Sequence, residues 1–181
     1  MRTLLHFSAF EHGDGDQQDL VLKELALVNL ELETSQSWIF LPPYPFEELT
    51  LALKFGNEYI SRHSYGLRWD DGDVPYMDLK KVLTTYTEGS GTLYTFGKAR
   101  QKFLEEILQR TVINLQELRC PKYSDLSFPT KSCVHPLHQF RKYRCALREA
   151  KCYAQFIKYS DLSLHILPRR QPTPITEPDV D

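Results

Sequence analysis

Two cysteines and two histidines lie close together in the stretch CVHPLHQFRKYRCALREA, from Cys133 to Ala150. The four residues span thirteen positions and are Cys133, His135, His138 and Cys145. Thiolate sulfur and imidazole nitrogen are common ligands of structural zinc, so this stretch could supply two or three ligands of one ion. Cys145 is expected on the first turn of a helix, the others on the loop before it, and a further ligand elsewhere in the fold.

The spacing of these residues matches no common zinc finger. A finger places paired ligands two to four residues apart, and either Cys133 or His135 could pair with His138 in this way, with Cys145 as the third ligand. In a second interpretation, Cys145 is a small residue buried in the core and the histidines lie on the surface. The residues alone leave both interpretations open.

The composition limits the class of protein. With 181 residues, 41% of them apolar, the chain is long enough for one domain with a buried core. Its net charge of −2 implies no general attraction to nucleic acid or to an anionic membrane. The cysteines show no paired spacing, and the sequence has no signal-peptide pattern. No apolar run approaches the ~20 residues of a membrane span. These features predict an intracellular protein, in cytoplasm or nucleus, with no membrane partner.

Apolar periodicity predicts an alternation of strands and helices. Short or alternating apolar runs predict strands at 4–10, 20–32, 37–41, 92–96 and 112–115, although 20–32 could also form a helix. Helical spacing predicts helices at 46–63, 77–86, 98–108 and 143–160. Three meandering strands followed by helix, strand, helix and strand imply a mixed five-stranded α/β sheet with helices on its faces. Residues 1–167 are expected to form this domain, and the proline-rich residues 168–181 a disordered tail.

Several motifs along this order resemble the ribonuclease H-like fold, in particular its DEDDh-type exonucleases. KELALV at Lys23–Val28 resembles their second strand, and HSYGLRWDDGDVPYMDLKKVL resembles a loop and the helix that follows it. LYTFGKARQKFLEEIL resembles the next strand and helix, and RCALREA at Arg144–Ala150 resembles the closing helix motif. The resemblance implies a ribonuclease H-like sheet with a cleft that holds two metal ions in those enzymes.

Within this resemblance, most of the catalytic carboxylates are missing. A two-metal exonuclease needs about four carboxylates and a general base. The Asp-x-Glu motif of the first strand falls on Ala9 and Glu11, or one residue earlier on Ser8. Gln101 or the adjacent Arg100 stands near the position of a further carboxylate.

The closing motif lacks the general base. Arg144 takes the place of the catalytic histidine, and an arginine cannot act as a base at neutral pH. Glu149 takes the place of the aspartate. Glu11 and Glu149 are therefore the remaining candidate catalytic residues, and the resemblance implies no conventional two-metal site.

A DEDDh-like fold without its carboxylates, but with a cluster of metal ligands, resembles the Maelstrom domain of germline small-RNA pathway proteins. The hallmark of that family is a Glu-Cys-His-Cys zinc site. Carried onto this chain, the glutamate is Glu24 of KELALV, the histidine is His138 and the last cysteine is Cys145 of CALREA. The second ligand stays open between Cys133 and His135.

A zinc site of this kind would be structural. Zinc held by four protein ligands has no open position for water, and its binding energy becomes folding energy. The resemblance thus implies one zinc ion that ties the C-terminal helix to the sheet across more than 100 residues of sequence.

A second group of residues could bind nucleic acid. Seven basic residues fall on the two elements that border the cleft: Lys98, Arg100, Lys102, Arg141, Lys142, Arg144 and Arg148. The aromatic residues Phe140 and Tyr143 interleave with them. Such side chains could follow a single-stranded backbone and stack on its bases, although an ordinary solvated helix face would have the same composition.

The leading expectation is a zinc-stabilised, catalytically degenerate exonuclease-like domain that binds single-stranded RNA or DNA, with RNA preferred, in a small-RNA or transposon-silencing context. The alternatives are a protein-interaction adaptor on the same scaffold and a weak ribonuclease with a nonstandard site. Two acidic groups are expected to be solvated turns: Asp14 with Asp16, and Asp70, Asp71 and Asp73, of which the second could also hold a divalent cation.

Overall fold

The structure, a computed structural model, describes residues 1–12 and 19–166. Its strands are β1 (Arg2–His12), β2 (Asp19–Asn29), β3 (Ser35–Ile39), β4 (Thr92–Thr95) and β5 (Val112–Asn114). Its helices are α1 (Leu51–Ile60), α2 (Leu79–Thr87), α3 (Lys98–Leu108) and α4 (Ala146–Ile166). Short helical turns lie at Phe46–Glu48, Ser61–Tyr65, Tyr76–Asp78, Tyr123–Asp125 and Pro136–Gln139. Each strand and helix expected from the sequence is present, and the segment 20–32 contains a strand rather than a helix.

The five strands form one open sheet in the order β3-β2-β1-β4-β5. β1 pairs with β2, and β2 with β3, in antiparallel orientation. β4 pairs in parallel with β1 and with β5. α1 and α2 lie between β3 and β4 in the chain, and α3 connects β4 to β5, as a parallel pair requires. The prediction of a mixed five-stranded α/β sheet is therefore confirmed.

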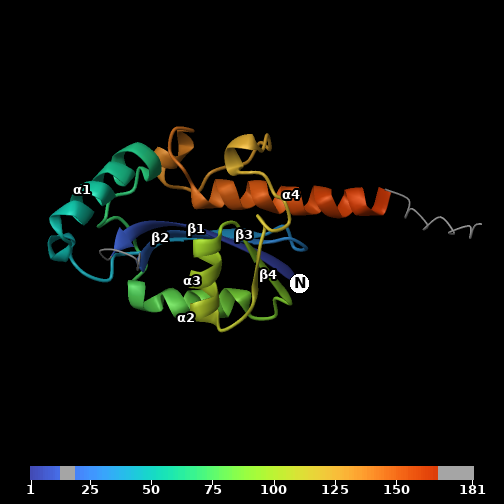
Figure 1. Ribbon diagram of the computed structural model, residues 1–181, viewed down its shortest axis with the longest axis horizontal. Helices are drawn as coiled ribbons and strands as arrows, with labels where there is room; N and C mark the ends of the chain where they lie inside the picture. The colour runs from blue at the N-terminus through green and yellow to red at the C-terminus, as the bar shows by residue number, and fades with distance from the viewer. Residues whose placement is uncertain (13–18, 167–181) are drawn as a thin grey trace, which may run out of the picture.

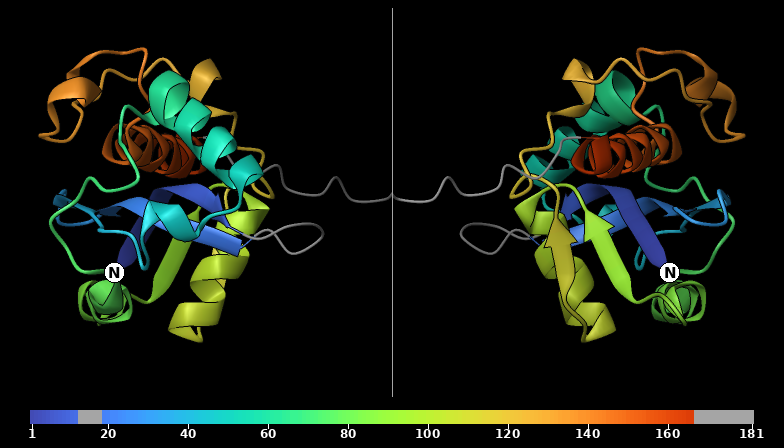
Figure 2. Two further views of the ribbon diagram at one scale, coloured as in Figure 1. Left: turned by 90° about the vertical axis from the view of Figure 1, so that its left-hand side faces the viewer. Right: turned by 90° about the vertical axis from the view of Figure 1, so that its right-hand side faces the viewer.

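Helices cover both faces of the sheet. α4 runs along one face, and α1 lies on the same side beyond the start of α4 (Figure 1). α2 and α3 lie on the opposite side, which is clearest in the two end-on views of Figure 2. The segment before α4 therefore lies between α1 and the start of α4. The candidate metal ligands are in this region.

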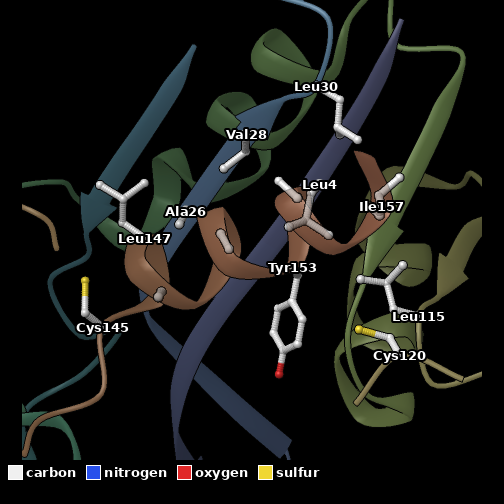
Figure 3. Packing of buried hydrophobic residues seen from close by; sticks show 13 residues of the cluster. Leu4, Ala26, Val28, Leu30, Leu115, Cys120, Cys145, Leu147, Tyr153 and Ile157 are labelled. Carbon is white, nitrogen blue, oxygen red and sulfur yellow. The ribbon is translucent and has the colours of Figure 1, made fainter. Parts of the chain in front are cut away.

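Each face of the sheet carries its own apolar core, because successive side chains of a strand point to opposite faces. Leu4, Ala26 and Val28 face α4 and belong to one cluster with Tyr153 and Ile157 (Figure 3). The opposite cluster packs against α2 and α3 and contains Leu5, Phe7, Leu22, Leu25, Leu27, Leu83 and Leu104. The first core fixes α4 over β1 and β2, and the second fixes α2 and α3 on the opposite face.

A β-bulge sets the direction of the side chains in the middle of β2. Ser8 of β1 pairs with Glu24, and Ala9 pairs with Leu22, so Lys23 is an extra residue on β2. The bulge lets Leu22 face the core under α2 and α3 while Glu24, two residues later, faces α4. The position of the candidate metal ligand on β2 thus depends on this irregularity.

The extra residue, Lys23, is buried and ties the loop at 69–71 to the sheet. Its ammonium group donates hydrogen bonds to the backbone carbonyls of Phe40 (2.9 Å), Trp69 and Asp71. Burial lowers the pKa of Lys23 to about 8. Three carbonyl acceptors satisfy all three N–H donors, which allows an ammonium group to be buried.

Two helices differ from their predicted bounds. The helix predicted at 143–160 begins at Ala146, so Cys145 directly precedes α4 instead of lying on its first turn. The segment predicted as one helix at 46–63 contains a short turn, then α1, then a π-helical turn. Thr50 begins α1, because its hydroxyl accepts a hydrogen bond from the Leu53 amide at 3.4 Å.

Two predictions lie outside the described residues: the turn with Asp14 and Asp16, and the tail 168–181. Within the described residues, no helix combines the length and the apolar composition needed to cross a membrane.

Candidate metal centre and basic site

The residues predicted to bind metal converge at the start of α4. Glu24 comes from the middle of β2, Cys133 and His138 from the loop before α4, and Cys145 from the residue just before the helix. One ligand atom from each residue lies within 4.8 Å of the other three. Glu24, His138 and Cys145 are buried, and Cys133 is partly buried. The four side chains could therefore hold one metal ion.

The contacts among these ligand atoms form a closed group. Glu24 Oε1 lies 3.4 Å from His138 Nδ1 and 3.5 Å from Cys145 Sγ. Cys133 Sγ lies 3.0 Å from His138 Nδ1, and the Cys133 backbone amide donates to Cys145 Sγ at 3.3 Å. A carboxylate, two thiols and an imidazole at these separations can surround a single small cation.

A hydrogen bond on the side of the ring that faces away from the cluster fixes the orientation of His138. Its Nε2 donates a hydrogen bond to the Tyr65 carbonyl at 2.7 Å, which leaves Nδ1 to face the cluster. Tyr65 ends the π-helical turn after α1, and Gly66 follows with a left-handed φ of 66°. A Cβ at Gly66 would lie only 2.9 Å from the ring of Tyr143, so a glycine is required for this close approach.

Glu24 also caps α4. Its Oε2 accepts a hydrogen bond from the Ala146 amide at 2.8 Å, one of the amides that have no partner within a helix. The Cys145 carbonyl accepts from the Glu149 amide at 3.0 Å, as the residue before a helix does. The carboxylate that faces the cluster therefore also anchors the start of α4 to β2.

His135 lies beside the cluster but does not belong to it. Its ring centre is 5.0 Å from that of His138. Its Nδ1 is buried without a hydrogen-bond partner among the described residues. Of the two residues that the sequence left open as the second ligand, the structure brings Cys133 into the group.

The pKa values of the four side chains in the cluster are shifted in different directions. Burial raises the pKa of the Glu24 carboxyl. The hydrogen bond between the two thiols lowers the pKa of Cys145 to about 3 and raises that of Cys133. Burial opposes charge on His138, but its bonds to Cys145 and Glu24 raise its pKa to about 10. The cluster thus already favours a thiolate, and a bound cation would displace the protons that remain.

Cys145 is both a candidate ligand and a core residue. It is fully buried and lies at the edge of the cluster under α4, near Ala26 and Leu147 (Figure 3). The two interpretations left open by the sequence are therefore compatible. Cys120 and Cys152 are also buried, and none of the four cysteines forms a disulfide.

A second polar cluster surrounds Glu149 on the first turns of α4. The Glu149 side chain is 2% exposed and accepts hydrogen bonds from Arg144 Nε and Nη2, each at 2.8 Å, and from His6 Nε2 at 2.9 Å. Burial opposes its ionisation, but these bonds hold the pKa of Glu149 well below its usual range. Burial, and then the charge of Arg100, lower the pKa of His6 to about 4, so His6 is neutral at pH 7.

His6 was not among the residues expected from the sequence to contact Glu149. A histidine inside the otherwise apolar run LLHFSAF was the available signal, because a buried imidazole requires a polar partner. Ser8, two residues further along β1, lines the same narrow pocket. Its hydroxyl is buried and has no hydrogen-bond partner among the described residues.

The structure does not bring Glu11 and Glu149 together. Glu149 faces His6, and Glu11 lies five residues further along β1, a distance of roughly 17 Å. The Glu11 backbone exchanges two hydrogen bonds with the side chain of Asn57 on α1. The residues of β1 that lie next to Glu149 are therefore His6 and Ser8 rather than Ala9 and Glu11.

Arg100 extends toward the Glu149 cluster from α3. Its Nε donates to the Phe7 carbonyl at 2.7 Å and its Nη1 to the Phe96 carbonyl at 3.3 Å. Burial lowers its pKa. Arg100 and Arg144 line the pocket that also contains Ser8, so α3 and the start of α4 border one basic site. The neighbouring Gln101 instead donates to the Val112 carbonyl at 2.8 Å.

The other predicted basic residues differ in their access to solvent. Four of them are exposed: Lys98, Lys102, Arg141 and Lys142. Arg148 is only 6% exposed, and its guanidinium donates to the carbonyls of His138 (2.8 Å) and Tyr143. Arg148 therefore anchors the loop that carries Cys133 and His138, and it is too deeply buried to contact a nucleic acid.

The acidic loop does not form a metal site. The Asp71 carboxylate accepts hydrogen bonds from the Arg68 amide and side chain, at 2.7 and 3.2 Å. Asp70 and Asp73 are exposed. Across residues 1–12 and 19–166, the group of Glu24, Cys133, His138 and Cys145 is the one cluster of three or more such side chains that could hold a metal.

Comparison with known proteins gives no family. No protein-family model matches the chain, and no curated protein matches its sequence. The geometry of the metal centre and of the basic site is therefore the basis on which a function can be argued.

Proposed function

We propose that this protein is a zinc-stabilised, catalytically inactive relative of the ribonuclease H-like exonucleases that binds single-stranded nucleic acid, with RNA preferred over DNA. The observation that carries the proposal is the environment of Glu149, a buried carboxylate whose charge is balanced by Arg144 and which accepts a hydrogen bond from His6. Exonucleases of this type gather carboxylates around two cations at the matching place. Here guanidinium groups supply the positive charge, so the site favours an anionic strand and requires no catalytic metal.

The donor set and its spacing support zinc as the ion of the Glu24 group. Zinc bonds of about 2.0–2.3 Å in a tetrahedron place ligand atoms roughly 3.3–3.8 Å apart. Of the separations in this group, 3.4 and 3.5 Å lie within that range and 3.0 Å lies below it. Two thiols argue against magnesium and calcium, which prefer oxygen ligands. Four protein ligands leave no open position for water, so the zinc is structural.

The topology supports the ribonuclease H-like relationship. An antiparallel meander of β1, β2 and β3 continues through parallel β4 and β5, and α4 crosses the sheet at the end. Glu24, Cys133, His138 and Cys145 follow the Glu-Cys-His-Cys order of the Maelstrom domain. We therefore place the chain beside that domain, whose context in small-RNA pathways and transposon silencing is part of this proposal.

The proposed nucleic-acid surface contains the exposed residues around the basic site. Lys98 and Lys102 project from α3, and Arg141 and Lys142 from the loop before α4. Phe140 is 54% exposed, and the Lys142 ammonium lies 4.7 Å from the centre of the Tyr143 ring. Charged groups beside exposed rings are typical of surfaces that follow a single strand and stack its bases.

Fluorescence anisotropy with a labelled single-stranded RNA across a salt series tests this surface. Affinity should fall with salt, with a slope that corresponds to roughly three to five released counterions. The triple variant Lys98→Glu, Arg141→Glu and Lys142→Glu should abolish binding. A matched control, Lys80→Glu with Lys81→Glu, changes exposed lysines of α2 outside the proposed surface and should bind as the wild type does. Absence of binding at low salt would overturn the proposal.

Incubation of the same RNA with Mg²⁺ or Mn²⁺ separates binding from hydrolysis. We expect no cleavage, because Arg144 cannot act as a general base and Glu149 is already engaged by two donors. Metal-dependent cleavage that disappears in Glu149→Gln would instead establish the weak ribonuclease.

A protein-interaction adaptor is the second candidate, and one observation favours it. Leu51, Phe55 and Tyr59 form a stripe along α1, and they are 70%, 66% and 65% exposed. Large apolar side chains gathered on one helix face mark interaction sites. An adaptor would lose its protein partner in Phe55→Ser and keep it when the charges of Lys98, Arg141 and Lys142 are reversed. RNA binding would be kept in Phe55→Ser and lost in the charge-reversed variant.

A further inference from the structure

A groove of about 570 Å³ lies along the middle of α4, away from both polar clusters. One wall is α4, from Lys151 to Tyr159, and the other is the turn between β2 and β3. The segment 129–131 closes the groove at one side, where the Thr130 hydroxyl donates to the Arg148 carbonyl at 3.1 Å. The volume lies within the range of about 300–1,000 Å³ of small-molecule sites.

The groove exists because β3 presents small side chains to α4. Val28 pairs with Ser35, and Ala26 pairs with Ser37. Directly paired residues of neighbouring strands project to the same face of a sheet. α4 packs on Ala26 and Val28, while Ser35, which lines the groove, is too small to fill the space over β3. The hollow is therefore a consequence of the sequence of β3.

The walls of this groove carry an excess of positive charge. Lys151 and Lys158 line it from α4, with Gln155 between them, and Lys131 lines it from the segment opposite. Glu33 is the one carboxylate among the lining residues, and it is paired with Lys158 at 2.5 Å. Neither Lys131 nor Lys151 has a carboxylate partner in the part of the chain that the structure describes. The groove therefore favours an anionic ligand.

The floor and rim of the groove are apolar and aromatic. Val28, Ala154 and Pro129 contribute to its lining. Tyr159 stacks on Phe128, with ring centres 5.3 Å apart and planes 7° from parallel, and the tyrosine is 58% exposed. A planar ring could stack on this pair, as nucleobases do on exposed aromatic side chains.

We propose that the groove binds a nucleoside monophosphate, with its phosphate between Lys131 and Lys151 and its base against Tyr159. Charge, an apolar floor and an aromatic rim occur together here, and a nucleotide is the ligand class that matches all three. A free nucleotide and the phosphorylated end of an oligonucleotide present the same chemistry. The site lies apart from the basic site around Glu149 and does not depend on strand binding there.

Nuclear magnetic resonance titration of the zinc-loaded protein with adenosine 5′-monophosphate tests this site. Backbone amides of Lys151 and Gln155 should shift in a saturable manner. The double variant Lys131→Ala with Lys151→Ala should weaken binding tenfold or more, and Tyr159→Ala several-fold. The matched control Lys80→Ala with Lys81→Ala removes the same charge from α2 and should leave affinity unchanged.

Three related probes define the ligand. Adenosine should bind at least tenfold more weakly than its monophosphate, because it lacks the charge. Equal binding of inorganic phosphate would show a simple anion site and would overturn the nucleotide proposal, as would tighter binding of an oligoglutamate peptide. A 5′-phosphorylated oligonucleotide that displaces the monophosphate, where its unphosphorylated form does not, would identify a strand end as the source.

Failure of this proposal can be told apart from failure of the proposed function. The variant with reversed charge at Lys98, Arg141 and Lys142 should lose RNA binding and keep the response to adenosine 5′-monophosphate. No saturable shift of the groove amides up to about 5 mM nucleotide, a limit near −3 kcal/mol of binding free energy, would overturn the nucleotide site alone.

Discussion

The carboxylate of Glu24, in the middle of the sheet, is bonded to the backbone amide of Ala146, the first residue of α4, at 2.8 Å. Its other oxygen faces the imidazole and thiols of the metal centre. One side chain therefore caps a helix and completes a ligand set. These two roles can be separated, because a glutamine can still accept a hydrogen bond from an amide but is a poor zinc ligand.

Glu24→Gln is expected to lose zinc and keep the cap, whereas Glu24→Ala should lose both. In the alanine variant the Ala146 amide has no acceptor, which costs about 1–2 kcal/mol. Elemental analysis gives the metal content, and urea unfolding in the presence of a chelator gives the stability of the metal-free proteins. Without metal, the alanine variant should be the less stable by that amount. Equal stabilities would show that the cap contributes nothing.

His138→Ala and His135→Ala form a matched pair, because the two imidazoles are neighbours but only His138 faces the cluster. Zinc should stay near one ion per chain in His135→Ala and fall toward zero in His138→Ala. Loss of the ion should reduce the free energy of unfolding by several kcal/mol, on the order of structural zinc sites. The prediction fails if His135→Ala also loses its zinc.

Arg144→Ala should destabilise the protein even though half of the arginine side chain is exposed. It leaves Glu149 buried with a neutral His6 as its remaining side-chain partner. Removing one partner of a buried ion pair costs about 3–5 kcal/mol, and partial exposure places this pair near or below the lower value. Denaturant unfolding should show this loss for Arg144→Ala and a change within about 0.5 kcal/mol for the exposed Arg141→Ala.

A double-mutant cycle gives a further check on this pair. Glu149→Gln removes the buried charge, so combining it with Arg144→Ala should cost less than the sum of the two single variants. Strict additivity would mean that the two side chains do not interact in solution.

The buried His6 makes stability depend on pH. Its folded pKa is about 4, against 6.5 for the unfolded chain, so the unfolded state binds more protons between these values. The free energy of unfolding should therefore fall as pH decreases from about 6.5 to about 4, by about 3 kcal/mol. His6→Gln retains a donor for Glu149 but cannot titrate. The difference in stability between this variant and the wild type should shrink or reverse over that interval, and a constant difference would contradict the assignment.

The main features of the fold were predictable because the apolar runs and helical spacings are strong local signals. Three members of the candidate metal group, Glu24, His138 and Cys145, were expected from the resemblance to the Maelstrom domain, and the structure brings them together. The bulge at Lys23 was not, because it depends on how β2 pairs with β1 and on the loop carbonyls that accept from the lysine. The partnership of His6 and Glu149 likewise depends on which residue of β1 lies under α4.

The start of α4 shows how tertiary contacts override a local pattern. Tyr143 and Arg144 fit the helical periodicity, but the Arg144 amide is bonded to the Ser64 carbonyl at 2.7 Å and the Tyr143 amide to the Phe140 carbonyl at 3.2 Å. These bonds hold the two residues outside the helix. Arg148 was expected at the surface but is buried. Its burial depends on two loop carbonyls whose positions no local pattern encodes.

The four ligands of the metal centre are distributed very unevenly along the chain. During protein synthesis Glu24 is made early, and the next ligand, Cys133, follows more than 100 residues later. At typical ribosomal speeds this interval lasts about 5 to 20 s. Strands β1 to β3 therefore leave the ribosome before the other three members of the candidate metal group and the helix amide of Ala146 exist. If the group binds zinc as proposed, the ion can be captured only after Cys145 has been made, so the docking of α4 on the sheet would depend on the zinc supply late in biosynthesis.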